Sequence, residues 1–235
     1  MISVVMITYN GAAYLDAQLD SVLGQLDADD EVVASDDGSS DGTWQTLQRR
    51  ARTDPRLRPI QGPGKGIVAN MEHALRAARG ELLLLCDQDN VWLPEKVARV
   101  RAEMDRTAAD VLLHDACLCD GGLRVMQPSF FAWRGCRRGF WHNVIKNSYI
   151  GCCMAVRADF LPRVLPFPQG VPMHDQWIGL MAERYGSVAL LAEALLMFRR
   201  HGGNASATRH SAVVRMLRWR LALLRALLRR KGEHR

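Results

Sequence analysis

The chain has 235 residues, of which 48% are hydrophobic and 24% charged. These proportions are those of an ordinary folded protein, and they exclude an intrinsically disordered, a collagen-like or a coiled-coil chain. The length is sufficient for one large domain with a short appendage.

The positive charge of the chain is concentrated at its C-terminal end. The residues from Arg209 onward include nine Lys or Arg and one acid, for a net charge of +8, whereas the preceding 208 residues carry a net charge of −2. A body with this balance does not favour binding to nucleic acid. We therefore expect no nucleic-acid partner.

Neither a secretion signal nor a membrane span is predicted. The first ten residues, MISVVMITYN, lack a basic segment, and the apolar run VALLAEALLMF is shorter than the roughly 18 residues that a membrane helix needs. The six cysteines show no C-x-x-C spacing, and most lie in apolar runs. This pattern favours buried thiols in a reducing compartment and no structural zinc, so we expect a cytoplasmic location.

The first 107 residues alternate between short apolar runs and longer amphipathic runs. The apolar, strand-like runs lie at 2–8, 31–35, 57–60 and 81–87, and the amphipathic runs between them lie at 12–26, 43–52 and 67–79. This alternation predicts an α/β fold with a mainly parallel sheet sandwiched by helices. After residue 107 the alternation weakens, and one further strand is expected near 110–119. Because such sheets bind ligands beyond the carboxyl ends of their strands, the residues that follow each strand are the candidates for chemistry.

Asp87 and Asp89 follow the fourth predicted strand. Their spacing of two places both carboxylates on the same side of an extended chain, where they repel each other unless a cation lies between them. Mg²⁺ commonly takes one or two carboxylates together with substrate phosphates. The pair therefore indicates a site for a divalent cation, Mg²⁺ or Mn²⁺. The alternative is an acidic turn that caps the next helix.

Asp36 and Asp37 follow the second predicted strand. A carboxylate at this edge can accept a hydrogen bond from a nucleobase or a ribose hydroxyl. The alternative is a turn, because Asp-Gly and Ser-Asp-Gly are typical turn sequences. Neither G-x-x-x-x-G-K-[ST] nor G-x-G-x-x-G follows a strand, which argues against an ATPase or a dinucleotide-dependent oxidoreductase.

Two further candidates lie in the second half of the chain. Asp175 precedes an amphipathic stretch, where an acid is either a helix cap or a functional carboxylate. Arg199 and His201 lie in a polar loop that suits the covering of a diphosphate, although a solvated basic loop has the same composition.

Taken in order, these motifs resemble those of the family-2 glycosyltransferases, which have the GT-A fold. The resemblance extends from Ile2 to about Asn204. Its carriers are Thr8-Tyr9-Asn10-Gly11, Ser35-Asp36-Asp37-Gly38-Ser39 with Asp41-Gly42-Thr43, Gly66 to Asn70, Asp87-Gln88-Asp89 with Trp92-Leu93-Pro94-Glu95-Lys96, Pro166-Phe167-Pro168, His174-Asp175, and Arg199 with His201-Gly202. The similarity is strongest to the branch that builds bacterial surface polysaccharides and includes rhamnosyltransferases.

The resemblance implies a domain at 1–204, with a nucleotide-sugar-binding half at 1–107 and an acceptor-binding half at 108–204. The resemblance also implies a role for each candidate. In the nucleoside pocket, Asp37 binds the nucleobase with Asp36 close by, and Tyr9 lines the pocket. Asp87 holds the ribose or donor sugar and adjoins the metal, and Asp89 holds the divalent cation. Asp175 is the general base, and Arg199 and His201 lie near the diphosphate. One departure is Asn90, where many relatives have a further acid.

The implied reaction is a metal-assisted single displacement that inverts the anomeric carbon. The donor would be a nucleoside diphosphate sugar, of the dTDP-rhamnose or UDP-hexose type, and the acceptor a hydroxyl of a glycan, lipid-linked in polysaccharide or O-antigen synthesis. A silent sugar-nucleotide-binding scaffold subunit is the alternative. A nucleotidyltransferase is disfavoured because the loop after the first strand has no cation. Candidates for acceptor contacts, each with an equally good core or turn interpretation, are His114, Asp115, Trp133, Trp141 and Gly151.

Residues 205–235 form a basic tail with the pattern of an amphipathic helix. On such a helix Arg215, Arg218, Arg225 and Arg229 share one face, and most of the apolar side chains lie opposite. This pattern favours an anionic membrane surface, and with it a peripheral location on the inner face of the plasma membrane. The alternative is a helix that packs on the body or on a partner.

Overall fold

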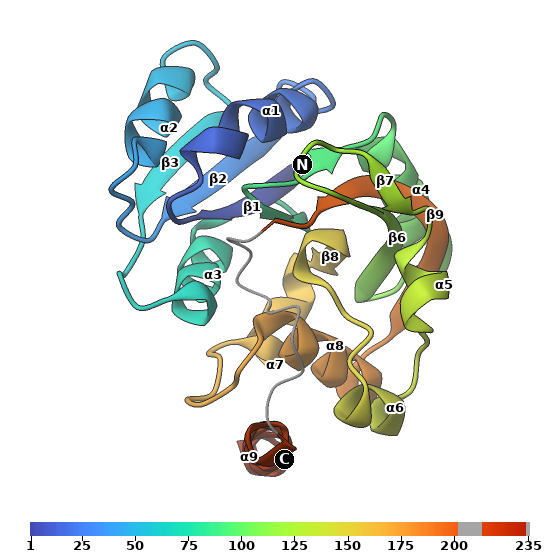
Figure 1. Ribbon diagram of the computed structural model, residues 1–235. Helices are drawn as coiled ribbons and strands as arrows, with labels where there is room; N and C mark the ends of the chain where they lie inside the picture. Colours follow the sequence, from blue (N-terminus) through green and yellow to red (C-terminus); the bar gives the residue numbers. More distant parts are fainter. Residues whose placement is uncertain (202–212, 234–235) are drawn as a thin grey trace.

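The computed structural model describes residues 1–201 and 213–233, and in the last helix the side chains of residues 219–230. The predicted boundary at 204/205 and the side chains of Arg215 and Arg218 therefore lie outside the described residues. The described chain forms one α/β unit around a nine-stranded sheet, with helices on both of its faces (Figure 1). The α/β fold predicted from the sequence is confirmed.

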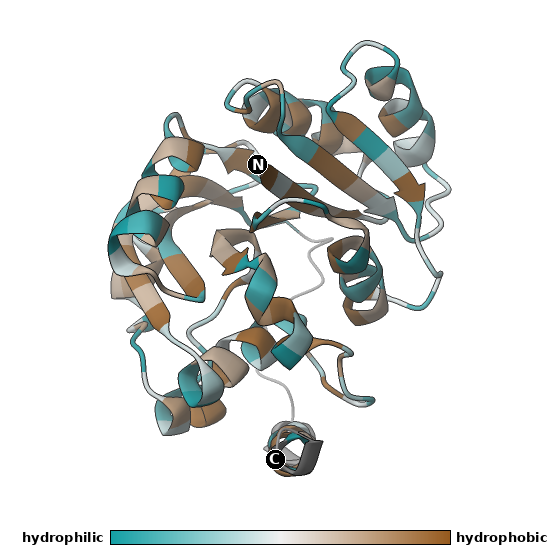
Figure 2. Cartoon of the chain, turned by 180° about the vertical axis from the view of Figure 1, so that it is seen from behind, coloured by the Kyte–Doolittle hydropathy of each residue, from teal (hydrophilic) through white to brown (hydrophobic). Residues whose placement is uncertain are grey.

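The N-terminal half of the sheet is parallel and has the strand order β3-β2-β1-β4. Strands β1 and β4 are mostly apolar, and β1, β2 and β4 are largely buried, as strands covered on both faces must be (Figure 2). Strand β3, at the edge of the sheet, buries only Leu57. Helices α1 and α2 lie on one side of these strands and α3 on the other (Figure 1). The bounds are β1 (Ile2–Thr8), α1 (Ala12–Leu23), β2 (Glu31–Asp36), α2 (Thr43–Ala51), β3 (Leu57–Gln61), α3 (Ile67–Ala77) and β4 (Leu82–Asp87).

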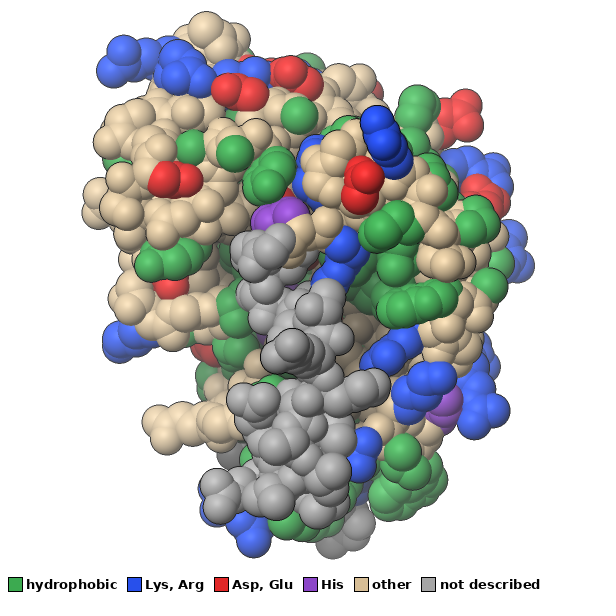
Figure 3. Space-filling view, in the orientation of Figure 1, with side chains coloured by type: hydrophobic (Ala, Val, Ile, Leu, Met, Phe, Trp, Pro, Cys, Tyr) green, Lys and Arg blue, Asp and Glu red, His purple; other side chains and the backbone are tan. Residues whose placement is uncertain are grey.

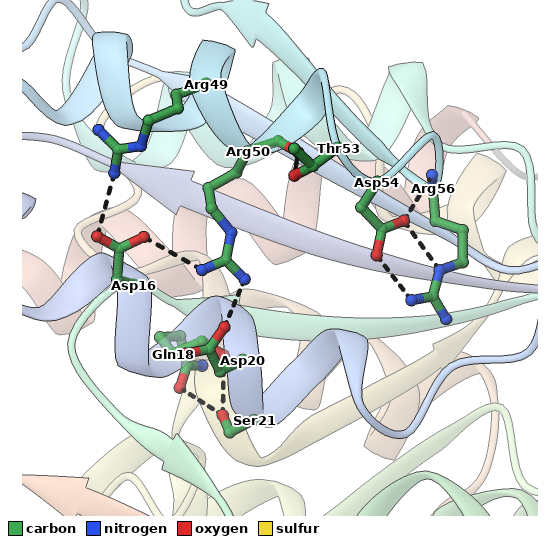
Figure 4. Close-up of polar contacts among 9 residues, drawn as sticks. All are labelled: Asp16, Gln18, Asp20, Ser21, Arg49, Arg50, Thr53, Asp54 and Arg56. Carbon is green, nitrogen blue, oxygen red and sulfur yellow. Dashed lines mark hydrogen bonds and ion pairs between the residues drawn. The ribbon is translucent and has the colours of Figure 1, made fainter.

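Ion pairs brace the first two helices against each other. Arg49 and Arg50 on α2 both contact Asp16 on α1, and Arg50 also contacts Asp20 one turn farther along (Figure 4). Exposed ion pairs of this kind contribute less than about 1 kcal/mol each, so the buried apolar side chains remain the main source of stability.

The second half of the sheet continues β4 through β8, β6, β9 and β5, with β7 paired to β6. The two longest strands, β6 and β9, are parallel to each other and to β1–β4, because the short strand β8 pairs antiparallel with both β4 and β6. The antiparallel strands are all short. The bounds are β5 (Val91–Trp92), α4 (Lys96–Thr107), β6 (Val111–Cys119), β7 (Val125–Gln127), α5 (Phe130–Arg134), α6 (Phe140–Ile145), a 3-10 turn η1 (Gly151–Cys153), β8 (Met154–Arg157), η2 (Ala158–Phe160), α7 (Leu161–Val164), α8 (His174–Tyr185) and β9 (Val188–Arg199).

The apolar run that most resembled a membrane segment, VALLAEALLMF, is strand β9. Among the described residues, no helix is long and apolar enough to cross a membrane. All six cysteines are free thiols, and Cys86, Cys152 and Cys153 are buried.

The basic tail forms helix α9 (Val213–Glu233). This helix packs on the body, because Leu223, Ala226 and Leu227 are buried. The sequence left open whether this helix binds a membrane or packs on the body. The face with Leu223, Ala226 and Leu227 packs on the body, so the opposite face is the one available to a partner.

Candidate active site

The candidate residues gather at one edge of the sheet. Strands β1, β2 and β4 run in parallel and pair in register, so that Thr8 lies beside Asp36 and Ile7 beside Asp87. The loops that follow these strands therefore meet, as expected for a ligand site of an open α/β sheet.

Two of these loops are fastened to each other by side-chain hydrogen bonds. Asn10, whose φ of 49° is one that Asn tolerates, donates its backbone N–H to Ser39 Oγ and accepts from the Ser40 N–H. Gly11 N–H donates to Thr43 Oγ1, and Ala12 N–H donates to Asp41. The polar residues after Gly38 thus shape the edge of the site rather than reach into it.

Asp36 and Asp37 are both held by their own surroundings. The buried Asp36 carboxylate accepts from Thr8 Oγ1 at 2.8 Å and from Ser39. The Asp37 carboxylate accepts from the N–H groups of Gly64 and Gly66, at 2.8 and 2.7 Å. Both acids therefore stabilise turns, and a nucleobase contact by Asp37 would use the lone pairs that these bonds leave available.

Gln88 is a residue that the sequence analysis did not single out. Its side chain accepts from the Tyr9 N–H and donates to the Tyr9 carbonyl, both at 2.8 Å, and so joins the loops after β1 and β4. The same side chain lies over Gly11, where a Cβ would stand 2.1 Å from Gln88 Cδ. Tyr9 itself keeps an exposed ring, available to line a nucleoside pocket.

Asp87 and Asp89 fit a divalent cation bound together with a diphosphate. Burial raises the pKa of Asp87, and the negative charges of Asp89 and Asp175 raise it further. A cation would relieve this repulsion. Within the residues that the structure describes, no three His, Cys, Asp or Glu side chains converge on one point, so the remaining ligands would come from phosphate oxygens and water.

Asp175 is buried at the start of α8, with only 4% of its surface exposed. Its carboxylate accepts from the N–H of Gln176 at 2.6 Å and from the Gly151 N–H. Burial nevertheless raises the pKa of Asp175 to about 6. A carboxylate with this pKa is ionised near neutral pH and can still accept a proton, which suits a general base.

A glycine and a histidine pack directly beside this carboxylate. A Cβ on Gly151 would lie 2.8 Å from His174 Nε2, so only Gly fits against the imidazole ring. His174 is buried and neither ring nitrogen has a hydrogen-bond partner, and burial lowers its pKa to about 4. His174 is therefore neutral, and its two buried ring nitrogens pack beside the loop that carries Gly151.

A buried lysine contacts the η1 turn, which lies next to both carboxylates. Lys96 on α4 is 1% exposed, donates to the Cys152 carbonyl at 3.0 Å, and lies over the Trp92 ring. The Cys152 thiol in turn lowers the pKa of Asp87 by hydrogen bonding, against the larger effect of burial. Lys96 thus anchors the η1 turn between the two carboxylates, Asp87 and Asp175.

Arg199 and His201 pack around Tyr14 of α1. The Arg199 guanidinium lies 4.9 Å from the Tyr14 ring and donates to the carbonyls of Asp89 and Gly121. The His201 ring lies 4.5 Å from the same tyrosine, and its Nε2 is 3.1 Å from Asp89 Oδ2. His201 is thus placed beside the predicted cation ligand, whereas Arg199 is largely engaged in holding the Asp89 backbone.

The predicted acceptor contacts fall into three groups. Asp115 is buried and caps α5 through Ser129 and the Phe131 N–H, and His114 is buried with Nδ1 at 2.7 Å from the Asp115 carbonyl. Both residues thus have the core or turn role that the sequence analysis gave as the alternative to an acceptor contact. Trp133 and Trp141 are exposed, at 56% and 68%. Of the five candidates, Gly151 lies against the Asp175 carboxylate.

The fold has clear counterparts among solved structures. S. aureus TarS 1-349 in complex with UDP-GlcNAc gives a TM-score of 0.70 at 21% identity, over 96% of this chain and 67% of that chain. The mannosyltransferase PcManGT from Pyrobaculum calidifontis, in complex with GDP-Man and Mn²⁺, gives 0.64 at 20% identity, over 99% and 63%. The fold is therefore that of the GT-A glycosyltransferases.

The sequence comparisons then place the chain within this class. Residues 3–165 match the family described as glycosyl transferase family 2, and the chain belongs to that family. An uncharacterized glycosyltransferase of Nostoc sp. is 26% identical over 86% of this chain, and an uncharacterized protein of Mycobacterium bovis is 29% identical over 85%. The chain spans 66% and 58% of the length of these two relatives.

Proposed function

We propose that this chain is an inverting glycosyltransferase that moves a sugar from a nucleoside diphosphate donor to a hydroxyl of a glycan. The observation that carries the proposal is the electrostatic link between Asp87 and Asp175. Asp87, the last residue of β4, bonds to the Cys152 thiol, and Asp175, in the first turn of α8, bonds to the Gly151 N–H, so both carboxylates contact the short η1 turn. They are close enough for the charge of Asp175 to raise the pKa of Asp87. A donor-binding carboxylate and a candidate base therefore face the same space.

In this reaction, Asp175 accepts the proton of the acceptor hydroxyl as its oxygen attacks the anomeric carbon. The bond from that carbon to the diphosphate breaks, and the nucleoside diphosphate leaves with the bonding electron pair. A divalent cation held by Asp89 and Asp87 would neutralise the charge that develops on the diphosphate. Lys96 and Gly151 keep the Asp87 and Asp175 carboxylates apart and oriented.

The donor site is assigned to the loops after β1, β2 and β4. Tyr9 and Asp37 would contact the nucleoside, and Asp36 would support that loop. Arg199 and His201 would lie near the diphosphate, with Arg199 holding the Asp89 backbone. Relatives of the same fold bind UDP-GlcNAc and GDP-Man, so the donor base and sugar have to be measured. A dTDP-rhamnose or UDP-hexose donor and a lipid-linked glycan acceptor, at the inner face of the plasma membrane, remain part of the proposal.

The test compares Asp175→Asn with Asp89→Ala. Asp175→Asn should reduce release of nucleoside diphosphate from the donor about 10²- to 10⁴-fold while leaving nucleotide affinity unchanged, because the base acts on the acceptor. Asp89→Ala should lower both the release of nucleoside diphosphate and the nucleotide affinity. Asp175→Asn with the parental transfer rate would refute the mechanism. Donor binding without transfer in the parent protein, with membrane lipid extract as acceptor, would instead support a silent scaffold subunit.

A further inference from the structure

Helix α9 uses one face to pack on the body. Leu223, Ala226 and Leu227 are buried there. At the two ends of this contact, Arg220 donates to the Ile145 carbonyl of α6, and Arg230 donates to the Pro166 carbonyl at 2.8 Å. The helix is therefore fixed in rotation, and its opposite face points away from the body.

That outward face carries both leucines and arginines. Leu221 and Leu228 are 52% and 64% exposed, and their spacing of seven places them on the same side of the helix. Arg225 and Arg229 are also exposed, and Arg225 lies between the two leucines. Large exposed apolar side chains flanked by arginine are unusual on a surface that contacts only water.

Helix α6 extends this face. Trp141 and Ile145 are 68% and 64% exposed, and their spacing of four places them on one side of α6. The Arg220 contact with Ile145 holds α6 and α9 side by side. Both helices lie at the same end of the molecule in Figures 1 and 2, and Figure 3 shows apolar and basic side chains next to each other at that end.

We infer that α6 and α9 together form a docking surface for an anionic lipid membrane. The surface consists of Trp141, Ile145, Leu221, Arg225, Leu228 and Arg229. Residues 140–145 and 219–230 contain no acid, and the chain from Arg209 onward has a net charge of +8, which matches anionic headgroups. The apolar side chains enter the interface while the arginine side chains extend to the phosphates.

This surface is directly connected to the candidate base. Gln176, the neighbour of Asp175, donates its side chain to the Asn143 carbonyl of α6 at 2.8 Å. Docking through α6 and α9 would therefore bring the acceptor side of the site close to the lipid headgroups. The inference concerns membrane binding alone, so it can be tested apart from the proposed transfer reaction.

The experiment measures sedimentation of the full chain with vesicles. We expect binding to vesicles that contain phosphatidylglycerol and weak binding to pure phosphatidylcholine. Arg225→Ala with Arg229→Ala should weaken binding to the anionic vesicles about 30-fold, at about 1 kcal/mol for each arginine. Trp141→Ala with Ile145→Ala should weaken it at least about 10-fold. Trp133→Ala, at a tryptophan on α5 that is 56% exposed, should bind as the parent does.

Circular dichroism and thermal melting establish that each variant is folded. Parental binding by the α6 double variant would overturn the inference, because the tail alone would then be the anchor. Equal binding to neutral and anionic vesicles would also overturn it. A stable dimer of the parent in analytical ultracentrifugation that becomes a monomer in the α6 double variant would overturn the inference as well. A second copy of the chain would then cover this surface.

Discussion

Gln88 binds the Tyr9 backbone through two hydrogen bonds, both 2.8 Å long, and these bonds join the loop after β4 to the loop after β1. Gln88 lies between the two acids of the Asp-Gln-Asp motif. The side chain that fixes the loop after β1 and the two carboxylates that we propose as cation ligands thus come from three consecutive residues.

We expect Gln88→Ala to destabilise the protein by about 1–2 kcal/mol, because two backbone groups lose a protein partner. Nucleotide affinity should fall as well, since Tyr9 is no longer held. Chemical denaturation and calorimetric titration measure the two effects. Gln61→Ala, at an exposed glutamine at the end of β3, serves as the control. A Gln88→Ala variant with parental stability and affinity would show that the two bonds are unimportant.

Gly11→Ala should reproduce this phenotype. Its Cβ would lie 2.1 Å from Gln88 Cδ and would force the glutamine away from Tyr9. Because the two substitutions remove the same interaction, the double variant should lose less free energy of unfolding than the sum of the single variants. Strict additivity in the denaturation data would contradict this coupling.

The rate of transfer should depend on pH through Asp175. Its pKa is raised to about 6, and only the ionised form can accept a proton, so kcat/KM should decrease about tenfold per pH unit below pH 6. The profile should lose this acidic limb in Asp175→Asn. A parental profile that is flat between pH 5 and about 7 would exclude Asp175 as the group that titrates.

Asp87→Asn should raise the melting temperature at pH 8 when no divalent cation is added. Burial raises the pKa of Asp87 from its ordinary value of 3.8 to about 7 in the folded state. Between these two pH values the native protein binds more protons than the unfolded chain, so its stability falls as the pH rises over this interval, and the loss is complete at pH 8. Asp87→Asn removes the ionisable group and with it this pH-dependent loss of stability.

Two comparisons check that result in the same thermal scans. Mn²⁺ should stabilise the parent at pH 8 and stabilise Asp87→Asn less, because a ligand has been removed. Asp29→Asn, at an exposed acid that precedes β2 and so lies at the opposite end of this strand from Asp36, should leave the melting temperature within about 1 °C of the parent. A lower melting temperature for Asp87→Asn would mean that the ionised carboxylate stabilises the fold.

Gly151→Ala should lower kcat and leave nucleotide affinity unchanged. The added methyl group would meet His174 Nε2 at 2.8 Å and shift the residue that precedes Asp175. Gly122→Ala, whose Cβ would meet only Asp120 Oδ1 at 3.4 Å, is the matched control. If nucleotide affinity falls together with kcat, then Gly151 supports the whole site rather than the base.

The parallel half of the sheet could be predicted from the sequence because β1 and β4 are continuous apolar runs, β2 and β3 contain shorter ones, and amphipathic helices lie between them. The strand β8 could not, because its four residues pair with β4 and β6 only after a long excursion of the chain from residue 120 to residue 153. The aromatic stretch after Pro128 likewise gave no period long enough to predict α5 and α6.

For the site, strand position and spacing indicated Asp36, Asp37, Asp87 and Asp89 as candidates, whereas Asp175 was a candidate as an acid that precedes an amphipathic stretch. Strand position and spacing did not distinguish residues that bond to neighbouring loops from residues whose side chains could contact a ligand. Asp36, Asp41 and Thr43 bond to neighbouring loops, which depends on how β1 and β2 align. Gln88 and Lys96 were missed because their partners, Tyr9 and Cys152, are distant in sequence.

We propose that Asp89 helps to bind a cation and a nucleoside diphosphate at a site where Asp175 is not needed for that binding. Calorimetric titration with UDP, dTDP and GDP, each with and without Mn²⁺ or Mg²⁺, tests it directly. We predict metal-dependent binding of one nucleotide to the parent and to Asp175→Asn, and its loss in Asp89→Ala. Binding of no nucleotide, or binding that Asp89→Ala leaves intact, would contradict the account.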